Sequence, residues 1–170
     1  MVAPKATVIA VLTDPNYGSS YDDVRYLEAA ARAIGLKMVV VKASSERELE
    51  PAFAAIGNAG AGALVVTGNA FMTSQSRQLA ALAARHAIPA IYDVRDHAVA
   101  GGLISYAASF TGAYRQAGVY AGNILKGAKP SAMPVLQPST FELVINLKTA
   151  KALGLTVPQS VLLRADEVIQ

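Results

Sequence analysis

Short apolar runs alternate along much of the chain with longer amphipathic segments. The runs are rich in Val and Ile and almost unbroken by polar residues, which is typical of parallel strands covered on both faces. The segments between them carry apolar residues at helical spacing. This alternation predicts an α/β fold, with an open parallel sheet flanked by helices and right-handed crossovers. Strands are predicted at 6–12, 37–42, 63–66, 90–92 and 102–106, and helices at 20–34, 45–56 and 73–86.

The pattern changes after residue 106. A single long helix is predicted at 111–126, where Gly118 and Gly122 contribute to a flat face of small residues, and glycine and proline then indicate a loop. The remaining predicted elements are a strand at 141–145, a short helix at 147–153 with Asn146 as its N-cap, and a terminal helical segment at 158–169. We therefore treat residues 1–170 as a single α/β lobe.

Polar and aromatic residues gather where four of these strands end. In a parallel sheet the carboxyl ends of the strands lie along one edge, so the four groups should meet in one crevice. Their aromatic faces, amides and few charges suit a small polar or zwitterionic solute. The predicted ligand-binding residues are Asp14, Asn16, Tyr17, Asn69, Phe71, Tyr92, Asp93, Arg95 and Tyr106.

Each kind of side chain in this set has an expected contact. The tyrosines and the phenylalanine would stack on the apolar part of the solute. The guanidinium of Arg95 would bind a carboxylate, and Asp93 or Asp14 would bind an ammonium group. Structural alternatives stay open, since the aromatic rings could pack at the sheet edge, Asp14 could cap the first turn, and Arg95 could form a surface ion pair.

The sequence lacks the motifs of common enzymes and cofactor sites. The turn after the first strand holds one glycine instead of Gly-x-Gly-x-x-Gly, and neither a P-loop nor Gly-x-Ser-x-Gly occurs. The two histidines, His86 and His97, do not have the spacing of a zinc site, and there are no cysteines. We therefore expect a binding protein and not an enzyme, and we expect it to use no cofactor or metal. His97 follows Asp93 and Asp96, which indicates a charged cluster near the crevice.

Composition agrees with one well-buried domain. The chain has 170 residues, of which 53% are hydrophobic and 16% charged, and disordered chains show the opposite balance. Its net charge of +3 is scattered, so we expect no nucleic-acid partner, because such proteins concentrate basic residues on one face. Residues 1–5 lack the features of a signal peptide, and no window approaches the roughly 20 apolar residues of a membrane span.

A resemblance to a known family extends over nearly the whole chain. The stretches that carry it read IPAIY at 88–92, AGGLISY at 100–106, YRQAGVY at 114–120, ILKG at 124–127 and, most specifically, FELVINLKTAKALGL at 141–155. They resemble the periplasmic substrate-binding component of ABC transporters, in its tryptophan/tyrosine-type branch. The resemblance implies a flavodoxin-like lobe of a type I binding protein, which closes over a solute by hinge motion and presents the closed form to an ABC permease.

The resemblance also implies that this chain corresponds to the C-terminal lobe. Relatives are about twice as long and carry a signal peptide and an N-terminal lobe, which implies a periplasmic location for the full-length parent. The helix and loop at 111–138 would cross to that other lobe. Without it, we expect the helix at 111–126 to fold back on its own sheet, or to pair with a second chain in a homodimer. The implied solute is an amino acid or a small carboxylate, although Asn69 stands where many relatives carry an acidic residue.

Two other functions are retained as alternatives. A ligand-sensing effector domain of a transcription regulator shares the fold, but no DNA-binding helix pair is predicted here. A flavodoxin-like or sugar-phosphate enzyme is disfavoured, because the chain has neither a phosphate loop nor an acid–base constellation.

Overall fold

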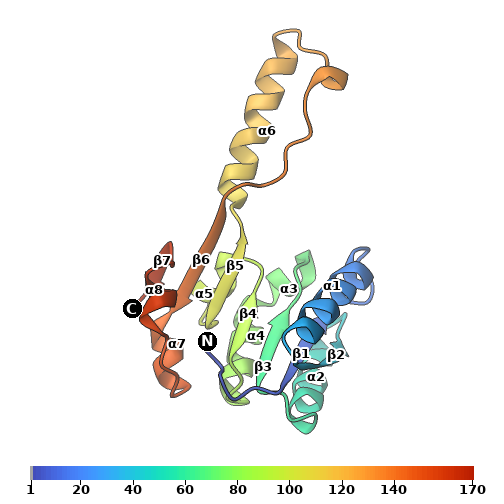
Figure 1. Cartoon of the computed structure of the whole chain (residues 1–170). Helices are drawn as coiled ribbons and strands as arrows, with labels where there is room; N and C mark the ends of the chain where they lie inside the picture. Colours follow the sequence, from blue (N-terminus) through green and yellow to red (C-terminus); the bar gives the residue numbers. More distant parts are fainter. Residues whose placement is uncertain (1) are drawn as a thin grey trace.

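A computed structural model describes residues 2–170, so Met1, the first residue of the predicted lobe, lies outside the described residues. A seven-stranded sheet in the order β2-β1-β3-β4-β5-β6-β7 forms the centre of the molecule, with helices on its faces (Figure 1). The α/β class is thereby confirmed. The strands are β1 (Val8–Thr13), β2 (Lys37–Lys42), β3 (Ala63–Val66), β4 (Ala90–Tyr92), β5 (Ile104–Ala108), β6 (Phe141–Asn146) and β7 (Glu167–Ile169).

The first five strands are parallel, as their continuous apolar runs predict. β1 pairs with β2 on one side and with β3 on the other, so the direction in which strands are added reverses between β1 and β3. Such a reversal is a topological switch point, and it separates the loops that leave the carboxyl ends of the two strands. The fold therefore opens the edge that carries Asp14 and Asn69.

The last two strands differ from the predicted all-parallel order. β6 runs antiparallel to β5 and β7 runs parallel to β6. β6 is antiparallel because the chain leaves the sheet at the end of β5 and returns at the same end. The prediction of a terminal helix at 158–169 was wrong in its second half, since only α8 (Gln159–Leu162) is helical before β7 begins. Asp166 accounts for this, because its backbone N–H donates to the Leu143 carbonyl oxygen and its side chain accepts from the Leu143 N–H, at 2.9 and 2.8 Å.

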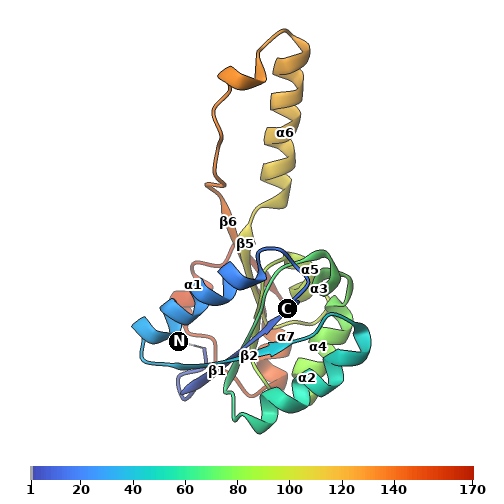
Figure 2. The same ribbon diagram turned by 90° about the vertical axis from the view of Figure 1, so that its right-hand side faces the viewer.

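Helices cover the two faces of the sheet unequally. The main core lies between the sheet and helices α2 and α4, where Leu49, Phe53 and Leu79 are fully buried. α1 lies on the opposite side of the sheet, and Ala31 is its one buried residue (Figure 2). The helices other than α8 are α1 (Ser20–Ala33), α2 (Glu46–Asn58), α3 (Ala70–Ser74), α4 (Ser76–Arg85), α5 (Arg95–Val99), α6 (Phe110–Leu125) and α7 (Leu147–Ala152), with a 3-10 turn at Pro130–Ala132.

Local capping explains where several helices begin. The side chain of Asn146 accepts the Thr149 backbone N–H at 3.1 Å, which confirms its predicted role as an N-cap. Asn69 caps α3 in the same way, through the Met72 N–H at 2.8 Å. The predicted helix at 73–86 is divided into α3 and α4 at Gln75, and the short helix α5 was not predicted.

Residues 110–140, here called the arm, project away from the sheet as helix α6 and an extended return segment (Figure 1). No residue of α6 is buried, and Tyr114, Leu125 and Val135 are 75%, 88% and 96% exposed. The expectation that this helix folds back on its own sheet was therefore wrong. The β5–β6 ladder continues to the pair Ala108–Phe141 and directs the arm outward. Within residues 2–170, no helix has both the length and the apolar character needed to cross a membrane.

Candidate functional site

The carboxyl ends of β1 and β3 are joined by polar contacts between Asp14 and Asn69. Asp14 is 8% exposed, and its two carboxylate oxygens accept hydrogen bonds from the Asn16 backbone N–H at 2.9 Å and from Asn69 Nδ2 at 3.4 Å. The hydroxyl of Thr67 lies 3.3 Å from the Leu12 carbonyl oxygen, which ties the same two strands together. Asp14 therefore shapes the first turn, as its structural alternative predicted, while Asn16 is exposed beside it.

Asp93, at the end of β4, differs from Asp14 in having a buried oxygen without a partner. Among residues 2–170, Oδ1 of Asp93 has no hydrogen-bond partner, although the side chain as a whole is 32% exposed. Burial raises the pKa of this carboxyl, and nearby His97 opposes the shift. The carboxyl occupies the space beside Gly68, where a Cβ atom would lie 1.9 Å from Oδ2. The absence of a side chain at Gly68 is what admits the carboxyl.

His97 lies fully buried directly behind Asp93. Its Nε2 is 3.2 Å from the Met72 carbonyl oxygen, and its Nδ1 is 4.0 Å from Asp93 Oδ1. The ring stacks on Tyr92, with centroids 4.7 Å apart and planes inclined by 14°. Burial lowers the pKa of His97 and raises that of Tyr92 far above its ordinary value. Tyr92, a predicted ligand-binding residue, is 2% exposed and lies in the core, so it supports His97 from below the surface.

The guanidinium of Arg95 is held by a carboxylate from the far end of the chain. Its Nε and Nη2 donate to the two oxygens of Glu167 at 2.6 and 2.7 Å. This pair raises the pKa of Arg95 and lowers that of Glu167. This geometry does not support the expected contact between Arg95 and a solute carboxylate, because Glu167 already binds Nε and Nη2 of the guanidinium. The surface ion-pair alternative describes Arg95 better, with Glu167 as the partner.

The remaining predicted aromatic residues lie in three different settings. Tyr17 is 44% exposed on the loop after β1, and Phe71 is half-buried against the main core. Tyr106 is 53% exposed and stacks on Phe141 at the base of the arm, with ring centroids 5.7 Å apart. The structure therefore places Tyr17 and Tyr106 at the surface of the carboxyl edge and does not bring all four rings together.

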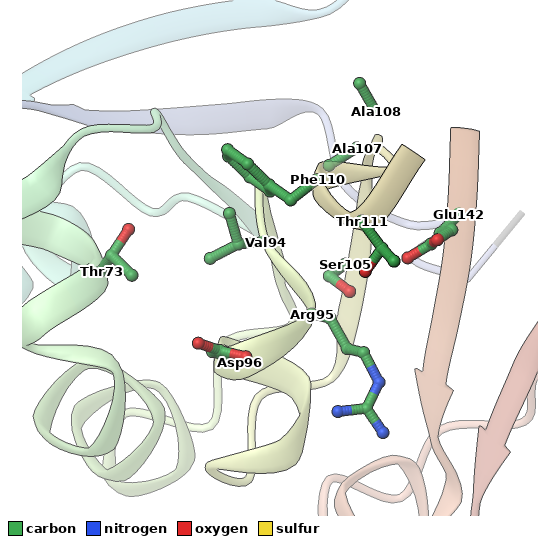
Figure 3. Close-up of a pocket in the computed structure, with 10 residues that line it drawn as sticks. All are labelled: Thr73, Val94, Arg95, Asp96, Ser105, Ala107, Ala108, Phe110, Thr111 and Glu142. Carbon is green, nitrogen blue, oxygen red and sulfur yellow. The ribbon is translucent and has the colours of Figure 1, made fainter. Parts of the chain in front are cut away.

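A cleft of about 460 Å³, here called the basal cleft, opens between α3, α5, β5 and the base of the arm (Figure 3). Phe110 and Val94 lie side by side on its apolar wall, while the Arg95 guanidinium points away from them. Ser105 contributes a hydroxyl from a residue that is only 2% exposed. The lining residues are Thr73, Val94, Arg95, Asp96, Ser105, Ala107, Ala108, Phe110, Thr111 and Glu142.

Sequence reasoning missed most of this lining. Phe110 and Thr111 belong to α6, and Glu142 comes from β6, so their approach depends on the antiparallel return of the chain. Asp96 was noted only as a member of a charged cluster. One signal in the sequence could have located part of the basal cleft. Residues 94–96, which line it, directly follow the predicted site residue Asp93.

The electrostatic balance of this edge is acidic. Asp96 and Glu142 contribute carboxylates to the lining of the basal cleft, whereas the nearby positive charge of Arg95 is neutralised by Glu167. The arrangement suits a cationic group on a small molecule, held beside an aromatic wall and several hydroxyls. Among residues 2–170, no three His, Asp or Glu side chains gather in a group that could hold a metal ion.

Two comparisons with known proteins bear on the family and the fold of the chain. The sequence profile of the family described as "ABC transporter substrate binding protein" matches residues 1–169. None of the curated protein sequences matches the chain.

Solved structures provide the second comparison. The ABC domain from Streptococcus pneumonia in complex with L-Trp shares 27% identity, with a TM-score of 0.88 over 99% of this chain and 57% of that one. A conserved domain protein from Vibrio cholerae shares 23% identity, with a TM-score of 0.89 over 98% of this chain and 56% of that one. The ligand-free, open form of a Clostridium difficile substrate binding protein with adhesive properties shares 23% identity, with a TM-score of 0.75 over 99% of this chain and 56% of that one. The chain thus spans little more than half the length of these structures.

Proposed function

Since this chain belongs to the ABC transporter substrate binding protein family, we propose that it forms one lobe of a receptor for a small solute that carries an ammonium group. The family consists of binding proteins rather than catalysts. A regulator effector domain and a flavodoxin-like enzyme are not favoured by this assignment. The receptor would present its solute to an ABC permease at the outer face of the inner membrane.

The observation that carries the proposal is the uncompensated carboxyl of Asp93 beside the basal cleft. Its Oδ1 is buried without a partner, so ionisation there is costly until a positive group arrives. Asp96 and Glu142 add to the negative potential, and Phe110 supplies an apolar wall. An amino acid with an apolar side chain combines these features. The L-Trp bound to the Streptococcus structure agrees with that class.

The arm would provide the connection to a second lobe. The Vibrio and Streptococcus structures match 98% and 99% of this chain, arm included, with TM-scores of 0.89 and 0.88. Those proteins extend well beyond the matched part, so the additional chain could cover α6. Exposed Tyr114, Val119 and Leu125 give the arm an apolar surface of the kind that is usually covered by a partner. Residues 111–138 would then belong to the hinge and the other lobe.

Hinge closure would convert solute binding into a signal for the permease. A solute held between two lobes binds the closed form better than the open one, and it shifts the equilibrium by that difference in affinity. The β5–β6 ladder is the connection between the sheet and the arm, so the hinge would lie near its end, at Ala108 and Phe141. A periplasmic location follows for a protein with this role.

Three related compounds test the proposal on this chain by ligand-observed NMR. L-Tryptophan and tryptamine carry an ammonium group, whereas indole-3-propionate does not. We expect binding of the first two, on the order of millimolar because one lobe supplies half of the contacts, and none of the third. Asp93→Asn should abolish binding, whereas Asp22→Asn on α1 should not. Equal binding of all three compounds, or binding that survives Asp93→Asn, would contradict the proposal.

A further inference from the structure

Two hydrogen-bond acceptors face each other at the end of β4 with no donor between them. The Nε2 atom of His97 lies 3.2 Å from the Met72 carbonyl oxygen, which can only accept, so the ring proton belongs on Nε2. Nδ1 is then left with a lone pair. It lies 4.0 Å from Asp93 Oδ1, and both atoms are buried without a partner among residues 2–170.

Burying two acceptors in this way is unfavourable, because each has lost its hydrogen bonds to water. One proton would satisfy both atoms if the Asp93 carboxyl held it and donated it to Nδ1. A distance of 4.0 Å is too long for that hydrogen bond, but rotation of the carboxyl about its Cβ–Cγ bond would shorten it. The pair therefore has two arrangements, one with the carboxyl protonated and turned to His97, and one with it ionised and separated from the ring.

Groups from four elements surround the Asp93–His97 pair, and the buried hydroxyl of Tyr92 also has no hydrogen-bond partner among residues 2–170. Helix α5 presents Asp96, β4 presents the ring of Tyr92, α3 presents the Met72 carbonyl oxygen, and the loop after β3 presents the backbone of Gly68. Burial raises the pKa of Asp93 and lowers that of His97, and both shifts favour a carboxyl proton over an ion pair.

We propose that Asp93 holds a proton that it donates to His97 in the empty protein, and that the ammonium group of a solute displaces this proton. The proposal rests on the proposed function, since it concerns the same carboxyl. The step is an exchange in which the proton passes from the Asp93 carboxyl to solvent as the ammonium approaches the resulting carboxylate. Because Asp93 is partly exposed and His97 is not, His97 is a positioning residue and does not touch the solute.

This arrangement has two consequences for binding. The site discriminates against neutral and anionic solutes, because only a cation compensates for the lost proton. Affinity also falls as the pH decreases, since the solute must then compete with a more tightly held proton.

The first experiment requires no solute. In the ¹³C- and ¹⁵N-labelled chain, NMR titration should give Asp93 a pKa above its ordinary value of 3.8, with the Nδ1 resonance of His97 changing in the same titration. His97→Gln should lower the Asp93 pKa, because the glutamine amide can donate to the carboxylate. If Asp93 titrates at or below that ordinary value, and His97 Nδ1 does not respond, the proposal is overturned. The wild-type result is decisive even if the variant does not fold.

The second experiment adds tryptamine at a pH at which Asp93 is still protonated. The Asp93 carboxyl resonance should move to its ionised position, with release of about one proton per tryptamine bound. Indole-3-propionate should leave it unchanged. If tryptamine perturbs the edge while Asp93 keeps its proton, the inference fails and the proposed function stands. If tryptamine perturbs nothing at the edge, the proposed function fails, and displacement of the proton fails with it.

Discussion

The guanidinium of Arg95 donates two hydrogen bonds to the carboxylate of Glu167, from Nε at 2.6 Å and from Nη2 at 2.7 Å. The contact links the first turn of α5 to the terminal strand β7, across 72 positions of sequence. It removes the most evident carboxylate-binding group from the site and leaves the carboxyl edge acidic. Under the proposed function, the class of solute would therefore depend on Glu167, a residue far from the edge in sequence.

A double-mutant cycle on Arg95→Ala and Glu167→Ala should give a coupling of about 1 kcal/mol or less, because both side chains are more than one third exposed. The lowered pKa of Glu167 fixes the sign of the pH dependence. The coupling should be fully present above the ordinary glutamate pKa of 4.5 and disappear as the pH falls through the lowered value. Urea unfolding at several pH values measures it. A coupling that grows on acidification would contradict this pairing.

Gly68→Ala should displace the Asp93 carboxyl, since the new Cβ would lie 1.9 Å from Oδ2 and 2.5 Å from Cγ. We expect a loss of about 1–2 kcal/mol in unfolding free energy and loss of tryptamine binding. Gly57→Ala is the matched control, because its Cβ would meet nothing within 4 Å inside α2, and it should stabilise the protein by roughly 0.5–1 kcal/mol. Normal tryptamine binding by Gly68→Ala would mean that the carboxyl position does not matter.

Asp93→Asn should make the protein more stable at neutral pH while it removes solute binding. The raised pKa of Asp93 means that the folded protein holds its proton more tightly than the unfolded chain does, so stability declines as the pH rises above the ordinary value of 3.8. Asparagine carries no charge and avoids this penalty. The gain over wild type should vanish below that pH. Urea denaturation at neutral and acidic pH measures the stability gain and its loss. An Asp93→Asn variant that is less stable than wild type at neutral pH would refute the raised pKa of Asp93.

The arm should be dispensable for folding of the sheet. The backbone N–H of Ser109 donates to the Thr140 carbonyl oxygen at 3.0 Å, so a two-residue Asn-Gly turn can replace residues 110–139. We expect cooperative unfolding with a midpoint close to that of the full chain, because no residue of α6 is buried. The shortened protein should also self-associate less in sedimentation, since it lacks the exposed apolar side chains. A dimer that persists after the replacement would exclude α6 as the dimer contact.

The sequence was sufficient for the parallel half of the fold, because strands that are buried on both faces leave continuous apolar runs. It could not orient β6, since an apolar run reads the same in either direction and its pairing with β5 depends on the path of the arm. The helical spacing of Thr111–Lys126 predicted α6 well, but spacing does not reveal whether a face is covered.

The site, like the fold, could be predicted from the sequence only in part. Strand ends located Asp14, Asn69 and Asp93 on one edge, because parallel strands bring their carboxyl ends together. They could not show that Tyr92 points into the core, since either side of a doubly covered strand accepts an aromatic ring. Nor could they reveal the partner of Arg95, which comes from a segment that was expected to be helical.

Protein-observed NMR shows directly whether the carboxyl edge binds an ammonium-bearing solute through Asp93, as we propose. L-Tryptophan, added to the ¹⁵N-labelled chain at millimolar concentration, should shift the amide signals of Gly68, Asp93 and Val94, together with those of residues lining the basal cleft. The signals of α1 should remain in place. Shifts confined to another face, or no shift at the edge while α6 responds, would contradict the claim.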